Sequence, residues 1–182
     1  MKKIIFYALV ALFCISCSLE YDTSVSETLD ESIPTSRLYG VKRVQVQGGQ
    51  PRVSFEAREA VVWENREETE LMEFVFKEYG STRDIITTGQ AEYLLISDNQ
   101  DAIIEGQIYG YSLRNEASVE AEKLSWLDEK RELSSLGDTE VAITMDNGSL
   151  LVGKKFVADL YTNTTVFSSG VRGSLESGSQ DE

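Results

Sequence analysis

The chain has 182 residues, of which 17 are Lys or Arg and 31 are Asp or Glu, so its formal net charge is −14. It contains no histidine, which excludes the catalytic triads, metal centres and proton relays that depend on an imidazole. A pI near 4.5 argues against nucleic-acid binding, which needs clustered Lys and Arg. The length and the 41% hydrophobic content predict one folded domain, and two cysteines are too few for a disulfide scaffold.

The N-terminus has the pattern of a bacterial export signal. Two lysines precede an apolar run from Ile4 to Ile15, and Ser16 then stands directly before Cys17. As a helix the run spans about 18 Å, which is too short to cross a bilayer. A small residue followed by Cys at this place resembles the lipobox of bacterial lipoproteins, although Cys14 stands where that motif has Leu. The resemblance implies cleavage after residue 16, acylation of Cys17 and attachment to a membrane surface outside the cytoplasm.

Composition then divides the rest of the chain. We expect residues 1–16 to be the signal peptide and residues 17–36 to be the lipidated cysteine with a flexible acidic tether, since this stretch is polar and aperiodic. Residues 37–173 form the folded domain. Residues 174–182, rich in Gly, Ser and acidic side chains, are predicted to be a disordered tail.

Within the domain, turn signals separate segments of alternating polarity. The turn signals are Gly48-Gly49-Gln50-Pro51, Asp98-Asn99-Gln100-Asp101, Asp128-Glu129-Lys130-Arg131, Asp146-Asn147-Gly148 and Thr162-Asn163-Thr164-Thr165. Val141, Ile143 and Met145 share one face before the Asn147-Gly148 turn, which predicts a hairpin with the strand that starts near Leu150. Phe74 with Phe76, and Phe156 with Ala158, alternate in the same way and predict further strands.

Two regions are ambiguous by composition. Residues 56–76 and 117–136 are rich in Glu, Ala, Leu and Lys, and propensity alone favours helices there. An internal repeat favours strands instead. Aligning Ala57, Ala91, Ala121 and Ala158 gives offsets of 34, 30 and 37 residues, with apolar residues three and, in three copies, five positions later. A period of this length that contains a turn predicts stacked hairpins, and the change of parity after each alanine indicates a bulge or bend.

The repeat, the stretch Gly153 to Asp159 after a tight hairpin, and the terminal Ser169 to Gly173 resemble the LptC family of lipopolysaccharide export and the wider OstA-like group that includes LptA. The resemblance covers most of residues 37–173. The motif residues that carry it are Gly153, Phe156, Ala158, Asp159 and Gly170.

The resemblance implies an all-β fold, a twisted and partly open β-jellyroll of stacked antiparallel hairpins. It also implies a non-enzymatic periplasmic role, in which the protein takes lipopolysaccharide or a related glycolipid from an inner-membrane ATP-binding-cassette transporter. The lipid then passes to an LptA-like bridge protein through paired edge strands. The best-known LptC proteins have an N-terminal transmembrane helix where this chain has a lipobox, but the family favours the inner membrane as the place of attachment.

The strand phases predict which side chains face the interior, where the acyl chains of a glycolipid would lie. These residues are Phe55, Ala57, Phe74, Phe76, Ala91, Ile104, Ile108, Ala121, Phe156 and Ala158. For any one of these residues an ordinary hydrophobic core is the better interpretation, and a partly open lipid slot is favoured for the set only through the resemblance.

Other chemistry finds no support in the residues. The Asp98–Asp101 turn lacks the glycine and terminal glutamate of a calcium loop, and the glycine pairs do not follow phosphate-loop spacing. We therefore expect no catalytic residue, no metal and no cofactor. The alternative to glycolipid transfer is a membrane-tethered β-domain that acts as an envelope or surface interaction module without lipid cargo.

Overall fold

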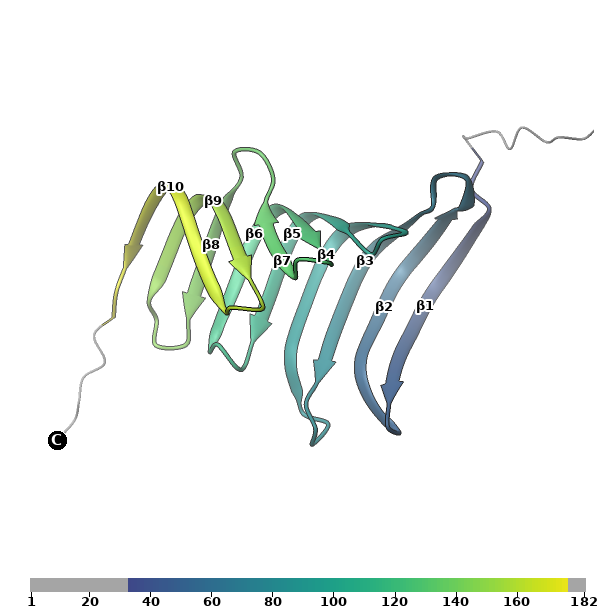
Figure 1. The fold of residues 1–182 in the computed structure, drawn as a ribbon, viewed down its shortest axis with the longest axis horizontal. Coiled ribbons are helices and arrows are strands. Elements are labelled where there is room, and N and C mark those ends of the chain that lie inside the picture. The colour runs from purple at the N-terminus through teal and green to yellow at the C-terminus, as the bar shows by residue number, and fades with distance from the viewer. Residues whose placement is uncertain (1–32, 177–182) are drawn as a thin grey trace, which may run out of the picture. The chain divides into compact units, whose positions relative to one another are not determined.

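A computed structural model describes residues 33–176, which form one antiparallel sheet (Figure 1). Its strands are β1 (Ser36–Gln47), β2 (Gln50–Trp63), β3 (Glu68–Tyr79), β4 (Ile85–Ser97), β5 (Ala102–Ser112), β6 (Ala117–Leu127), β7 (Glu132–Ser135), β8 (Glu140–Met145), β9 (Leu150–Asp159) and β10 (Thr164–Ser174), with a 3₁₀ turn at Glu64–Arg66. The predicted signal peptide, Cys17, most of the tether and residues 177–182 lie outside the described residues.

Each strand pairs with the next along the chain, except around β7 and β8. β6 pairs with β7 through its last residues and with β8 through its first, and β9 pairs with both in the same way. The two short strands therefore occupy one place in the sheet, interrupted by residues 136–139. β1 and β10 are the two edge strands.

The predicted all-β fold of stacked hairpins is confirmed. Thr144 pairs with Leu150 across the Asn147-Gly148 turn, as the alternation predicts. Both ambiguous regions are strand hairpins: residues 56–76 contain the end of β2 and most of β3, and residues 117–136 contain β6 and β7, each pair with a short turn between its strands. Helix and strand propensities differ by only a fraction of a kcal/mol per residue. Burial of the apolar face of a strand that pairs with a neighbour on each side contributes more than this, so it overrides the helical propensity.

The sheet bends along a line that crosses its strands (Figure 1). At this line Gly40, Glu73, Gly106, Gln107 and Lys155 adopt positive φ angles between 42° and 75°, and the pairing register shifts on both sides of β5. Such bulges bend a strand and re-aim its side chains. Three of the five residues carry a Cβ, which costs about 1 kcal/mol or more each in this conformation. This bend explains why the apolar positions of the sequence repeat change parity after each alanine.

Next to the bend, one row of the inner face alternates small and large residues. Across the sheet the row reads Ala57, Phe74, Ala91, Ile108, Ala121, Val141 and Gly153. The small residues come from β2, β4, β6 and β9, and the large ones from the strands between them. Alternation of this kind lets neighbouring side chains interdigitate where the sheet curves.

The fourth copy of the repeat is therefore wrong as aligned on Ala158. The residue that stands in the row with Ala57, Ala91 and Ala121 is Gly153. Ala158 lies on the other side of the bend at Lys155, opposite Leu133. The alignment on an alanine followed by an acid could not find this, because the fourth copy places a glycine at the crowded position.

Gly153 is required because the Phe167 ring lies against its backbone. A Cβ at this position would lie 2.7 Å from Phe167 Cδ1. We expect Gly153→Ala to destabilise the protein by about 1–3 kcal/mol, the usual cost of overpacking, measured by urea unfolding. In a Phe167→Ala background the same change should become neutral or stabilising, because the clash is gone and Ala restricts the unfolded chain. Equal costs in both backgrounds would contradict the proposed contact.

Candidate functional site

The candidate site is the inner face of the bent sheet. Its buried cluster contains Ala57, Phe74, Ala91, Leu94, Ile108, Leu124, Val141, Phe156 and Ala158, and the partly buried Phe55, Phe76, Ile104 and Ala121 pack against it. The structure thus brings all ten interior residues of the sequence prediction into one apolar region. Their role in lipid binding stays a prediction. Leu94, Leu124 and Val141 were missing from the predicted set, although the first two stand in the repeat three residues after an alanine.

Aromatic rings fill much of this face. The ring centroids of Phe74 and Phe76 lie 6.2 Å apart, and those of Phe55 and Phe76 lie 6.5 Å apart. On β9 and β10, the Phe156 and Phe167 rings are separated by 5.5 Å. Such pairs add about 0.5–1.5 kcal/mol each to the energy of burial, so this part of the inner face is closed by its own side chains.

At β1 the inner face is open. Val41 and Arg43 stand opposite Ala57 and Phe55, and they therefore continue the inner face onto the edge strand. Leu38, opposite Ala60, is 51% exposed, and Arg43 is exposed as well. The apolar interior thus reaches solvent along β1, beside a cation.

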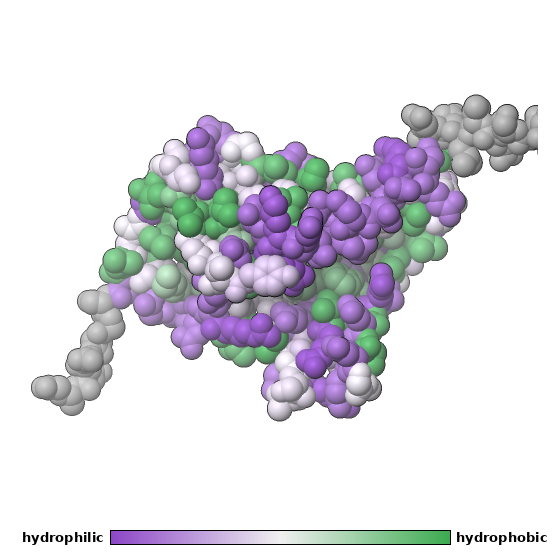
Figure 2. All heavy atoms as spheres, viewed as in Figure 1, coloured by the Kyte–Doolittle hydropathy of each residue, from purple (hydrophilic) through white to green (hydrophobic). Residues whose placement is uncertain are grey.

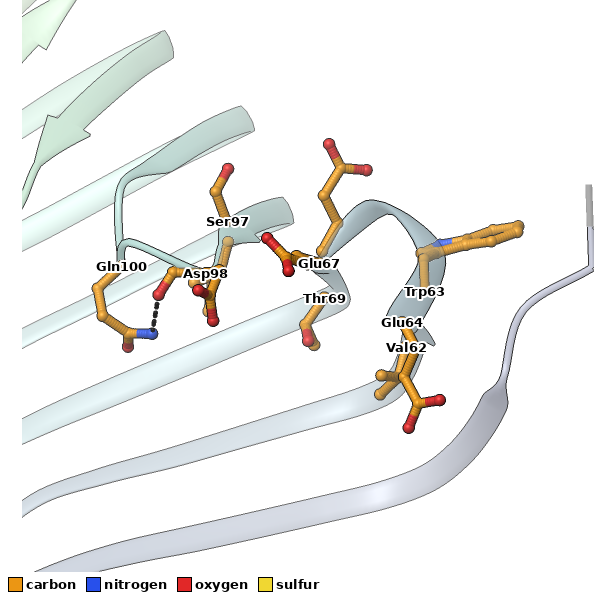
Figure 3. A pocket seen from close by; sticks show the side chains of 10 residues that line it. Val62, Trp63, Glu64, Glu67, Thr69, Ser97, Asp98 and Gln100 are labelled. Atoms are coloured by element: carbon orange, nitrogen blue, oxygen red, sulfur yellow. Dashed lines mark hydrogen bonds between the residues drawn. The ribbon is translucent and has the colours of Figure 1, made fainter. Parts of the chain in front are cut away.

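Two cavities in the described part of the chain lie near β2 and β3. One, of about 300 Å³, lies where the β2–β3 and β4–β5 turns meet, and Figure 3 shows Glu67, Thr69, Ser97 and Asp98 around it while the Trp63 side chain points away. The other, of about 390 Å³, lies over β1–β3 between Lys42, Glu56, Arg58 and Glu73. Both have mixed, charged linings, which do not suit an acyl chain.

The residues on which the resemblance to the LptC family rests have structural roles. Phe156 and Ala158 are core residues, and Gly153 receives the Phe167 ring. The Asp159 carboxylate accepts hydrogen bonds from the backbone N–H groups of Tyr161 and Thr162, at 2.8 and 3.0 Å, which lowers the pKa of Asp159. Gly170 has φ +61° and lies at a register shift between β9 and β10.

An ion pair missed by the sequence reasoning holds the edge strand β10. Arg172 Nη1 and Nη2 donate to Glu140 Oε1 and Oε2 at 2.7 and 2.9 Å, so the guanidinium binds the β8 carboxylate with two parallel bonds. This pair, mainly through its hydrogen bonds, lowers the pKa of Glu140 and raises that of Arg172. Only the register across β9 brings these residues together, and no local sequence signal indicates it.

In residues 33–176, no group of acidic or cysteine side chains is arranged to hold a metal ion. Within the same residues, no helix is long and apolar enough to span a membrane. What the inner face offers is an apolar cluster, whereas the outside of the molecule carries both hydrophilic and hydrophobic side chains, as Figure 2 shows for one of its sides.

Comparison with known proteins tests the fold. No protein-family model matches the chain, and no curated protein matches it. Among solved structures, the chain resembles the crystal structure of LptH from Pseudomonas aeruginosa, the LptA homologous periplasmic component of the conserved lipopolysaccharide transport device. The TM-score is 0.52 at 11% sequence identity, and the match covers 69% of this chain and 95% of the LptH chain.

This similarity establishes a shared fold. It confirms the all-β jellyroll of the LptA type that the sequence predicts. The narrower assignment to LptC stays a prediction.

The Glu140–Arg172 pair yields a titration prediction. Glu140 has a pKa below its ordinary value in the folded chain, so the pair stabilises the fold above that ordinary pKa and the contribution is lost as the pH falls through the lowered value. We expect Arg172→Gln to raise the pKa of Glu140 toward the ordinary value, measured by NMR titration of the carboxyl carbon. Glu120, an exposed carboxylate in β6, is the control and should not change. An unchanged Glu140 would contradict the pair.

Proposed function

We propose that this protein binds lipopolysaccharide or a related glycolipid in the periplasm and transfers it during export to the outer membrane. The observation that carries the proposal is a continuous apolar inner face, on a fold shared with a lipopolysaccharide transport component, that reaches solvent at β1. Transfer of this kind needs no catalytic group, which is consistent with a chain without histidine.

The physical basis is burial of hydrocarbon. Apolar surface removed from water contributes roughly 25 cal/mol per Å² without directional requirements, so a slot of Phe, Ile, Val and Ala accepts acyl chains of varied length. Leu38 and Val41 at the open side of the inner face provide the first apolar contacts. The charged head of the lipid stays in solvent, because moving an unpaired charge into the apolar cluster would cost far more than the cluster could return.

The finer steps follow the resemblance to the LptC family. The protein would receive the lipid from an inner-membrane ATP-binding-cassette transporter and pass it to an LptA-like bridge protein. Two edge strands, β1 and β10, are available for such contacts, since unpaired backbone groups at a sheet edge can add a strand of a partner. Placement in the periplasm and attachment to the inner membrane through acylated Cys17 belong to the same proposal.

A second function has one observation in its favour. From β2 to β9 the inner face is filled by its own side chains, with Val141 at 0% and Leu124 at 1% exposure. A filled core is what a membrane-tethered β-domain without lipid cargo needs, and such a domain would act as an envelope or surface interaction module.

Site-specific photocrosslinking separates the two functions. A photoreactive phenylalanine analogue at Phe55 or Phe156, in the full chain in cells, should form adducts with a glycolipid. The Phe55 adduct should be stronger, because Phe55 lies beside the open side of the inner face at β1 while Phe156 is 3% exposed. Tyr109 on the outer face, 37% exposed, is the matched control and should give none. Protein adducts alone from both inner positions would favour the interaction module.

The anchor is tested separately. Cys17→Ser should release the protein from membranes into the soluble fraction, because acylation needs the thiol. Mass spectrometry of the native N-terminus should show acyl groups on Cys17. Cys14→Ser is the control and should leave the protein on the membrane. An uncleaved N-terminus without acyl groups would contradict the anchor.

A further inference from the structure

One segment of this acidic protein contains basic residues and no acidic ones. No Asp or Glu occurs between Glu31 and Glu56, although the chain has 31 of them. This stretch forms β1 and the first part of β2. Arg43 and Arg52 lie in it, and both are exposed.

The fold adds two more cations to the same place. Lys77 of β3 pairs with Ser54 of β2, and Arg52 lies two residues before Ser54 on the same strand. Arg52 and Lys77 are therefore near neighbours on adjacent strands. Arg83, in the β3–β4 turn, donates from Nε to the side chain of Gln50, the first residue of β2 after the β1–β2 turn. The two turns therefore lie side by side at one end of the sheet (Figure 1). We call Arg52, Lys77 and Arg83 the basic corner; Arg43, on the neighbouring edge strand, belongs to the inner face with Phe55.

None of the three forms an ion pair within residues 33–176. The lysines and arginines of these residues that form ion pairs are Arg37, Lys42, Arg58, Arg66, Arg114, Lys123, Arg131, Lys154 and Arg172. The carboxylates near the corner already have other partners. Glu56 binds Lys42, Glu78 accepts from Arg114 and Thr87, and Asp84 accepts from Thr82.

Exposed apolar side chains lie among these cations. Val44 and Val46 at the end of β1 are 44% and 59% exposed, and Ile85 at the start of β4 is 45% exposed. Val44, Ser54 and Lys77 stand in one row across the sheet, so a valine and a cation share one face. Neither of the two cavities includes a residue of the basic corner.

We propose that the basic corner docks onto the surface of an anionic phospholipid membrane. Long basic side chains reach phosphate groups while their stems and the neighbouring valines and isoleucine enter the apolar boundary. A membrane requires no shaped pocket, and each Lys or Arg near an anionic surface strengthens partitioning by roughly fivefold. The strongly acidic remainder of the chain is repelled by the same surface, so the domain would be held with this corner toward the lipid. The proposal does not rest on the glycolipid-transfer function.

A fluorophore at the corner tests the proposal in residues 17–182, the chain that remains after the predicted cleavage, so that the apolar run from Ile4 to Ile15 cannot itself insert into vesicles. Cys17 is changed to Ser, and a polarity-sensitive dye is attached through Val46→Cys. Vesicles of phosphatidylcholine with phosphatidylglycerol should shift the emission to the blue, vesicles of phosphatidylcholine alone should not, and added salt should reverse the shift. The same dye at Tyr161→Cys, at a turn of the opposite end and 75% exposed, should stay unshifted.

Charge variants provide the matched control. Arg52→Gln, Lys77→Gln and Arg83→Gln together should raise the anionic lipid needed for half of the shift by on the order of a hundredfold. Lys130→Gln with Lys155→Gln, which also lack ion pairs among the described residues, should change it little. Circular dichroism and urea midpoints equal to those of the parent show that the variants are folded. Four results would overturn the proposal. They are an emission shift that persists in the triple variant, an equal shift at residue 161, no shift with anionic vesicles, and reversal of the shift by millimolar inorganic phosphate at constant ionic strength.

Discussion

The fold depends on the line where the strands bend. Residues of positive φ re-aim the side chains there, and the row of small and large residues beside it lets the curved sheet close over its own inner face. Without the bend a sheet of hairpins would leave one apolar face in water. With it, residues on both sides of the line, such as Phe74 and Phe156, belong to one buried cluster. The strain stored at Glu73, Gln107 and Lys155 is compensated by that burial.

Much of this arrangement could be predicted from the sequence. Alternation and the Asn147-Gly148 turn indicate the β8–β9 hairpin, and the alanine repeat favours strands in two regions where propensity favours helices. Its parity change indicates the bend. The fourth copy could not be placed by residue type, because Gly153 replaces alanine where the Phe167 ring needs the space. The Glu140–Arg172 pair was likewise invisible, because it joins strands that are neighbours only through β9.

The net charge of the chain hides an uneven distribution of charged residues along it. A pI near 4.5 suggests a surface that anions avoid, yet every charged residue between Glu31 and Glu56 is a Lys or an Arg. That asymmetry is readable from the sequence. Its extension to Lys77 and Arg83 is not, because it needs the β2–β3 register and the contact of Arg83 with Gln50. A strongly acidic protein with one basic corner has a preferred orientation near an anionic surface, which a uniformly acidic protein lacks.

Strand pairing also limits where the interior can change. From β2 to β6, and at β9, each strand is hydrogen-bonded on both sides, so widening the sheet there would break backbone hydrogen bonds that have no other partner. At the edge strands only side-chain contacts need to move. Of the two edges, β1 carries the exposed Leu38 and the half-buried Val41 on the inner face, whereas Arg172 fastens β10 to β8. An acyl chain that joins this core therefore meets the least resistance along β1.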